Sequence, residues 1–296
     1  MSWGFFAHKL INQHAIYTLP AELAGFFKIH HDAIRDKAID ADKRCYVDSL
    51  ESPRHYIDID KYLEPGPDSI PIHWSKANEK FGERLLIARG IVPWQIYFSY
   101  QRLTQAFVAR DVDLIIKHAA DLGHYLADAH VPLHTTQNYN GQFSNQIGIH
   151  ALWESRIPEM FADSYNLSVG RASYIEDPLA LAWTIVRESN QLVASVLAIE
   201  KKLSLEFPKH LARTYLLRNN SLSLTYSDAY VAAYHKRMRG MVEQRLQQSI
   251  LRLGSYWFSA WVDAGQPSFD LANLPSPEVL KVDLEAQPII GRQEWH

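Results

Sequence analysis

The eleven residues HYLADAHVPLH, from His124 to His134, place three histidines and one aspartate within one short stretch. On a helix, the four-residue separation of His124 and Asp128 puts both side chains on the same face. Pro132 then ends the helix, so His134 can turn back toward the same point. The spacing therefore predicts a helix whose last turns, with the residues after it, supply ligands to a bound metal ion.

A second pair with the same spacing follows in GIHALWES, where four positions separate His150 from Glu154. Imidazole nitrogen and carboxylate oxygen are ligands that zinc accepts, and catalytic zinc sites leave one position for water. Two such pairs indicate more than one metal ion. A metal-dependent hydrolase is therefore the first functional hypothesis.

The composition narrows the classes of protein to consider. A chain of 296 residues, 47% of them hydrophobic, can bury a substantial core, and its formal charge of −3 does not favour a stable nucleic-acid complex. Cys45 is the only cysteine, which excludes an intrachain disulfide and a cysteine-rich zinc site. No apolar run reaches the ~20 residues of a transmembrane segment, and the opening MSWGFFAHKL lacks the pattern of a signal peptide.

Hydrophobic periodicity is helical along most of the chain. Strand patterns are few, and the best short candidate is RHYIDID, residues 54–60. Ser227 is a candidate N-cap, and Gly265 and Pro267 stand where a helix would end. We therefore predict an all-α fold. The predicted helices cover residues 5–18, 22–38, 94–109, 112–129, 178–203 and 227–264, with a short helix from 155 to about 158.

The sequence contains no internal repeat and no low-complexity linker that would separate domains. Residues 62–73 and 137–149 are rich in loop-forming residues, and the second loop joins the two predicted metal pairs. The last thirty residues contain four prolines and little periodicity. We predict one domain over residues 1–266 and an irregular C-terminal tail over residues 267–296.

Further metal ligands must come from other parts of the sequence. His55 lies in RHYIDID, His8 lies close to the N-terminus, and Asp40 and Asp42 form an acidic pair. Taken singly, each is more simply explained as an ordinary buried or solvated side chain, because most isolated histidines and aspartates bind no metal.

Taken together, the motifs WGFFAH, ADKR, RHYID, HYLADAHVPLH and HALWE, in this order over residues 3–154, resemble a known superfamily. It comprises the bacterial zinc-dependent phospholipases C and the fungal and plant single-strand-specific zinc nucleases. The resemblance implies a single-domain, multi-helix fold of the phospholipase C/nuclease type, with up to three zinc ions in a cleft. It also implies a zinc-dependent phosphodiester hydrolase that is exported to the periplasm or the cell exterior.

By motif position, the resemblance implies three zinc sites. The first takes Asp42, His55, His124 and Asp128. The second takes His134, His150 and Glu154. The third takes His8, Asp128 as a bridging carboxylate, and the amino and carbonyl groups of Trp3. His130 matches a motif position that does not bind zinc directly, and we expect it to hydrogen-bond around the ligands.

Two features depart from the pattern of the superfamily. There the tryptophan is the first residue of the mature protein and its free amine binds zinc, whereas here Met1 and Ser2 precede Trp3. An amide nitrogen is a poor ligand, so we expect a chain beginning at Trp3 to bind more zinc. The nucleases also have Asp-x-x-Arg, whereas Arg44 follows Asp42 after one intervening residue. Asp40 therefore stays open as an alternative ligand to Asp42.

Clustered zinc ions suit phosphodiester hydrolysis, because zinc lowers the pKa of bound water from about 15.7 toward about 7 and neighbouring ions neutralise charge on the phosphate. By the resemblance, Asp42 would accept a proton from that water. Arg44 would stabilise the charge of the transition state. These two residues are the predicted catalytic groups.

The substrate stays open between phospholipid and single-stranded nucleic acid. The short spacing from Trp3 to His8 is that of the nucleases, whereas Glu154 in place of aspartate, and the lack of disulfides, are typical of the phospholipases. We narrowly favour a phospholipase C-like enzyme, with the nuclease as the alternative. A helical binding protein with structural or degenerate zinc sites is the hypothesis of another class. The sequence leaves the oligomeric state open.

Overall fold

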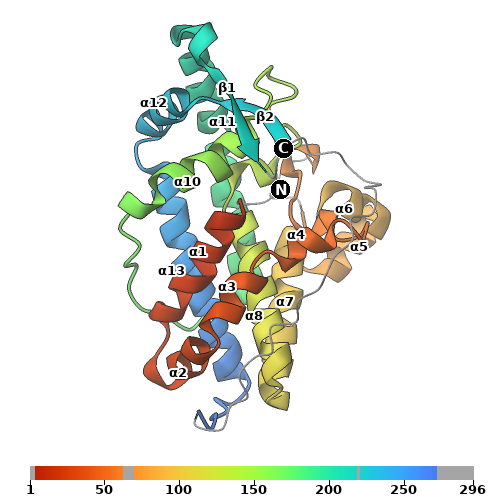
Figure 1. Ribbon diagram of the computed structural model, residues 1–296. Coiled ribbons are helices and arrows are strands. Elements are labelled where there is room, and N and C mark those ends of the chain that lie inside the picture. The colour runs from red at the N-terminus through yellow and green to blue at the C-terminus, as the bar shows by residue number, and fades with distance from the viewer. Residues whose placement is uncertain (1–3, 63–69, 219–220, 272–296) are drawn as a thin grey trace.

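The computed structural model describes residues 4–62, 70–218 and 221–271. Helices account for most of these residues, and the one sheet among them is a two-stranded hairpin (Figure 1). The expected helical class is therefore confirmed at this coarse level. The predicted tail lies largely outside the described residues, and the division into one domain and a tail stays a prediction. Within the described ranges, each helix is too short or too polar to cross a membrane.

Long helices build the body of the molecule, and they run alongside one another in Figure 1. Helix α8 packs against α7, α1 and α13, so it lies at the centre of the group. Buried tryptophans such as Trp94, Trp183 and Trp257 fill the space between them. The long helices are α1 (Phe5–Ala15), α7 (Val92–Ala109), α8 (Val112–Ala129), α11 (Pro178–Glu206) and α13 (Met241–Asp263).

The sequence explains where α8 begins and ends. Arg110 adopts a left-handed conformation, with φ 55°, that ends α7. The side chain of Asp111 then caps α8 by accepting a hydrogen bond from the backbone N–H of Leu114, at 3.0 Å. Pro132, two residues beyond the C-cap His130, cannot continue the helix. The observed bounds are those predicted from the periodicity.

Two predicted long helices are each divided in the structure. The stretch 22–38 forms α2 (Ala21–Ile29) and α3 (His31–Lys37), because His30 leaves the helical conformation and lets α3 pack against α1 and α8. The stretch 227–264 forms α12 (Asp228–Met238) and α13, separated at Gly240, whose φ is 83°.

Two other predictions about local structure were wrong. RHYIDID forms no strand, because the backbone N–H of Ile57 donates to the carbonyl oxygen of His134 (2.9 Å) and that of Asp58 donates to Arg89 (2.7 Å), so neither pairs with a neighbouring strand. The short helix near residue 155 also continues past Pro158, which occupies the first turn of α10 (Ile157–Phe161) where proline is tolerated.

The structure also contains a hairpin that the sequence did not predict. Strand β1 (Arg213–Arg218) pairs antiparallel with β2 (Ser221–Tyr226) between α11 and α12. The hairpin lies at the same end of the molecule as the beginning of α1, whereas α2 lies at the opposite end (Figure 1). Strand β2, with the sequence SLSLTY, alternates polar and apolar residues, and this alternation is the sequence signal that could have identified a strand.

The remaining elements are short and connect or cover the long helices. The α-helices among them are α4 (Asp40–Arg44), α5 (Trp74–Phe81), α6 (Glu83–Arg89) and α9 (Ile149–Ala151). The 3₁₀ segments are η1 (Ile16–Thr18), η2 (Ser52–Arg54), η3 (Ile59–Tyr62), η5 (Pro132–Thr135), η7 (Ala162–Ser164) and η8 (Lys209–Leu211). Segment η6 (Leu152–Arg156) is a π-helix.

Candidate metal centre

The stretch His124–His134 places its ligand candidates as its spacing predicts. His124 and Asp128 lie on one face of α8, with His124 Nε2 and Asp128 Oδ2 3.3 Å apart. His134 follows in η5, after the chain has turned at Pro132. All three side chains are buried, so their polar atoms must be satisfied by one another or by a bound ion.

The first group of converging side chains is His55, His124 and Asp128. His55 Nδ1 lies 2.9 Å from Asp128 Oδ2 and 3.0 Å from His124 Nε2. Asp42 Oδ1 lies 3.5 Å from His124 Nε2 and 4.0 Å from His55 Nδ1. The four residues expected at the first zinc site therefore meet at one point, although they come from three separate parts of the chain.

His8 joins this group from α1. Its Nε2 atom lies 3.3 Å from the other oxygen of Asp128, Oδ1, and its ring stacks on that of His124 at 3.9 Å between centroids. The close approach of α1 to α8 depends on Gly123, because a Cβ atom there would lie 2.0 Å from Asn12 Oδ1. Asp128 thus has a histidine on each oxygen, which is the arrangement expected of a bridging carboxylate. His8, Asp42 and His124 form a further group able to hold an ion.

The second cluster comprises His134, His150 and Glu154. The Nε2 atoms of the two histidines are 3.1 Å apart, and Glu154 Oε2 lies 2.8 Å from that of His150 and 3.4 Å from that of His134. Glu154 belongs to the π-helix η6, in which one extra residue per turn shifts the direction of its side chain. All three ligands predicted for the second site are therefore together.

Backbone carbonyl groups determine which nitrogen of two histidines faces inward. His124 Nδ1 donates to the carbonyl oxygen of Ala38, and His134 Nδ1 donates to that of His55, both at 2.7 Å. In the neutral imidazole the opposite atom, Nε2, then carries a lone pair. In each group this lone pair points toward carboxylate oxygen, so a proton or a metal cation is needed between them.

The electrostatics of the two groups agree with this interpretation. Burial lowers the pKa of His124 to about 3, so its ring is neutral. Burial alone would raise the pKa of Glu154, but the neighbouring His150 and His134 lower it to about 2. Burial also opposes protonation of His55, yet its hydrogen bond with Asp128 raises the pKa of His55 well above the usual value. In the metal-free chain, a proton on His55 therefore balances the charge of Asp128, and a bound divalent cation would take the place of that proton.

Asp42 and Asp40 take different positions, although the sequence left the choice between them open. The Asp40 carboxylate, about a third exposed, pairs with Lys43 Nζ at 2.8 Å on the surface of α4. Asp42 is buried and faces His124. The structure therefore brings Asp42 to the candidate centre.

Arg44, the second predicted catalytic residue, lies beside the first group and not within it. Its Nη2 atom donates to Asp121 at 2.9 Å, to Tyr125 Oη at 3.1 Å and to Glu51 at 3.4 Å. The side chain is about a third exposed, unlike the buried ligand candidates. Arg44 thus remains accessible, but it is held by an acidic cluster.

Sequence reasoning missed Glu51, which is fully buried next to the first group. Its carboxylate accepts hydrogen bonds from Tyr125 Oη and Arg54, and Oε1 lies 3.6 Å from Nε2 of His55. A carboxylate on the outer nitrogen of a ligating histidine fixes the orientation of the ring and increases its basicity. The four-residue spacing from Glu51 to His55 is the signal that could have identified it.

His130 differs from the expectation that it would hydrogen-bond around the ligands. Its Nδ1 donates to the carbonyl oxygen of Leu126 at 2.7 Å, and its Nε2 lies 3.2 Å from Arg252 Nη1 on α13. Arg245 also donates to its carbonyl oxygen at 3.0 Å. These contacts fasten the end of α8 to α13.

Trp3 lies outside the described residues, so its part in the third site stays a prediction. The neighbouring Gly4 is described, and its backbone N–H donates to the carbonyl oxygen of Glu154 at 3.2 Å. A Cβ atom on Gly4 would lie 2.6 Å from Ser155 Oγ, so glycine permits this approach. The chain therefore passes directly beside the second group at this point.

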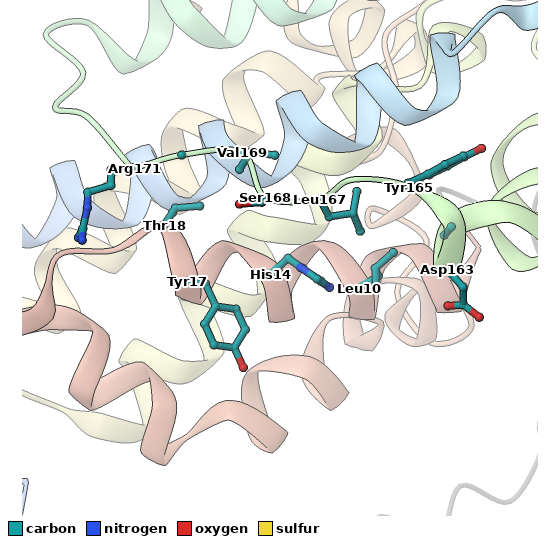
Figure 2. A pocket seen from close by; sticks show the side chains of 12 residues that line it. Leu10, His14, Tyr17, Thr18, Asp163, Tyr165, Leu167, Ser168, Val169 and Arg171 are labelled. Carbon is teal, nitrogen blue, oxygen red and sulfur yellow. The ribbon is translucent and has the colours of Figure 1, made fainter.

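A separate pocket lies between α1 and the segment 162–171 (Figure 2). Tyr17 and His14 line it from the helix side, and Tyr165 and Arg171 line it from the opposite side. None of the ligand candidates lines this pocket, so it is distinct from the metal centre.

Comparison with known proteins adds no assignment. Neither a protein-family model nor a curated protein matches the chain.

Proposed function

We propose that this protein is a zinc-dependent phosphodiester hydrolase and, more narrowly, a phospholipase C-like enzyme. The observation that carries the proposal is the convergence of buried histidine nitrogens and carboxylate oxygens at two neighbouring points, with Asp128 between His8 and His55. Structural proteins rarely bury so many ionisable groups together, because their desolvation is costly unless a cation compensates it. The nitrogen and oxygen donor set suits zinc.

The residues present fit the proposed ions. His55, His124, Asp42 and Asp128 Oδ2 would hold one zinc ion, and His134, His150 and Glu154 would hold a second. Asp128 Oδ1 is buried and has no hydrogen-bond partner in the described part of the chain, although His8 lies 3.3 Å away. This oxygen and His8 would hold a third ion together with Trp3.

Zinc, when bound, would supply a water of lowered pKa and positive charge beside the phosphate. The protein's own groups would provide the rest of the chemistry. Asp42, at the edge of the first group, would accept a proton during attack on the phosphorus. Arg44, accessible and fixed by Asp121, would donate hydrogen bonds to the phosphate oxygens as negative charge develops there.

The alternative function is a single-strand-specific nuclease with the same centre. Tyr139 favours it, because its ring meets that of His150 edge-on, at 5.8 Å between centroids, and an aromatic ring at such a site can stack on a base. A helical binding protein with structural zinc is the alternative of another class.

A paired assay separates these functions. The full chain, loaded with zinc, is incubated with phosphatidylcholine vesicles and with single-stranded DNA, each with and without a chelator, and the metal-free protein is then reloaded with zinc. We expect chelator-sensitive release of phosphocholine, restored by zinc. Cleavage of DNA alone would favour the nuclease. Activity on neither substrate, with zinc fully bound, would contradict the hydrolase and favour the binding protein.

A further inference from the structure

The β1–β2 hairpin has an inverted distribution of apolar side chains. Tyr215 is 66%, Leu217 68%, Leu222 68% and Leu224 56% exposed, and the register pairs Tyr215 with Leu224 and Leu217 with Leu222. These side chains therefore share one face of the hairpin, because alternate residues of a strand point the same way. A hairpin that only covered the protein would turn this face toward the core.

The opposite face is the more covered one, and apart from the half-buried Leu216 its described side chains are polar. Thr214, Ser223 and Thr225 are half-buried there, although these side chains gain little from leaving water. Reversing the hairpin would bury the leucines, yet the fold keeps them outside. Contiguous exposed apolar side chains of this kind are typical of a surface that binds a partner protein or a membrane.

The charge of this segment indicates that the partner is a membrane. From Lys209 to Tyr226 the sequence contains lysine and arginine but neither aspartate nor glutamate, in a chain of net charge −3. The side chains of Lys209 and Arg213 are exposed at the base of the hairpin. Cationic groups beside exposed leucine and tyrosine match the surface of an anionic bilayer, where the apolar groups enter the acyl boundary and the cations meet the headgroups.

The base of the hairpin is also attached to the loop that leads into the second metal group. Arg213 Nη2 donates to the carbonyl oxygen of Ile147 at 2.7 Å, and Tyr226 Oη lies 3.4 Å from the same oxygen. His150 follows three residues later. Ile147 and Phe143, in the same loop, are themselves 53% and 71% exposed. A surface that holds the hairpin would therefore also hold the loop next to the candidate centre.

We propose that the exposed face of the hairpin, formed by Tyr215, Leu217, Leu222 and Leu224, docks the protein onto an anionic phospholipid surface. This inference rests on the proposed phospholipase C-like function, because it specifies how that centre meets an aggregated substrate. The chemical class of the partner is a bilayer rich in anionic headgroups. Docking would hold the zinc-binding end of the molecule at the interface.

Vesicle sedimentation tests the proposal with the zinc-loaded full chain. The vesicles are phosphatidylcholine alone and phosphatidylcholine mixed with phosphatidylglycerol. The test variant is Leu217→Thr with Leu222→Thr, which keeps residues that favour strands. The matched control is Val108→Thr with Leu114→Thr, two exposed apolar residues of α7 and α8. Circular dichroism and thermal unfolding check that each variant is folded.

We expect the wild-type chain and the control to bind the mixed vesicles more tightly than vesicles of phosphatidylcholine alone. The hairpin variant should bind the mixed vesicles with an affinity at least about tenfold lower than that of the wild type. Hydrolysis of a soluble monomeric phosphodiester should be equal in all three proteins. If hydrolysis fails in all of them while vesicle binding behaves as expected, the proposed function fails and the docking surface stands. Three outcomes would overturn the docking proposal: no vesicle binding by the wild type, equal binding by the hairpin variant, or a hairpin that mediates self-association or DNA binding without binding vesicles.

Discussion

The imidazole Nδ1 of His134 donates a hydrogen bond to the backbone carbonyl oxygen of His55 at 2.7 Å. The two residues belong to different groups of candidate metal ligands, so this bond joins the two groups directly. This bond orients the ring of His134 so that its Nε2 faces Glu154. The ring of His55, whose carbonyl oxygen accepts the bond, faces Asp128 with its Nδ1. The two groups are thus parts of one centre.

Asp128→Asn should remove both zinc and activity. Asp128 faces His8 with one oxygen and His55 and His124 with the other, and an amide cannot replace a bridging carboxylate. Loss of an outer partner of a metal ligand already costs about 10- to 100-fold, so loss of this residue should reduce the activity to below about a hundredth. Elemental analysis and the phosphodiesterase assay measure the two effects on the same sample.

The matched control for this variant is Asp263→Asn, since Asp263 accepts hydrogen bonds from Tyr100 and Tyr174 away from the ligand candidates. It should bind as much zinc as the wild-type chain. An active Asp128→Asn protein with full zinc content would rule out the bridging role.

Arg44→Gln should reduce turnover without reducing bound zinc. Arg44 contacts none of the ligand candidates in the described structure, but it is fixed beside the first group by Asp121 and Tyr125. Loss of one donor to a developing oxyanion costs about 100-fold or more in turnover. Steady-state kinetics with zinc held at saturation measure this effect.

Arg54→Gln serves as the control, because Arg54 also pairs with Glu51 and is about equally exposed. Its turnover should stay close to that of the wild type. Equal losses in the two variants would mean that Arg44 supports only the Glu51 cluster.

Glu200→Gln should weaken zinc binding at His134, His150 and Glu154 alone. The buried carboxylate of Glu200 accepts hydrogen bonds from Gln146 at 2.5 Å and from Tyr230 at 2.8 Å, and Gln146 lies four residues before His150. An amide at position 200 is uncharged and offers one acceptor oxygen in place of two, which weakens these hydrogen bonds and loosens the loop 137–149.

Calorimetric titration of the metal-free protein with zinc should then report a loss of about tenfold in affinity for one class of site. The control Glu206→Gln removes a surface partner of Arg237 and should bind zinc as the wild type does. A uniform loss over all classes of site would indicate general destabilisation and would contradict a local role for Glu200.

The metal-free protein should lose stability as the pH rises above 6.5, the ordinary histidine pKa. Burial opposes protonation of His55 and His134, but hydrogen bonds with Asp128 and Glu154 respectively raise the pKa of both. A raised pKa in the folded state contributes stability that is fully present below pH 6.5 and is lost as the pH rises through the raised values. Bound zinc would take the place of these protons, so the zinc-loaded protein should keep its stability.

Thermal unfolding over a pH series, with and without a chelator, measures this difference. The gap between the two melting temperatures should widen toward mildly alkaline pH. A metal-free melting temperature that increased over the same range would contradict the assignment of protons to His55 and His134.

The sequence by itself determined the helical class and the pairs of candidate ligands that are four residues apart. The four-residue spacing of His124 and Asp128 puts both on one face of the α-helix, and the same spacing predicted the pairing of His150 with Glu154, although the structure forms the latter through a π-helix. The bounds of helix α8 also follow from residues next to its ends, because Asp111 caps its first turn and Pro132 prevents its continuation. These signals involve residues close together in the sequence, so the sequence alone is enough to predict the features that they determine. The resemblance of the ordered motifs added the grouping of residues distant in sequence.

The tertiary structure decided which residues from distant parts of the chain come into contact. It chose Asp42 over Asp40, placed the unpredicted Glu51 behind His55, and divided two long periodic stretches at His30 and Gly240. It also formed the hairpin with its leucines outward. The pattern of side chains in the sequence indicates only whether a residue is apolar or ionisable. Which partner it meets depends on how helices from separate segments pack, and a centre buried among α1, α4 and α8 exists only when they do.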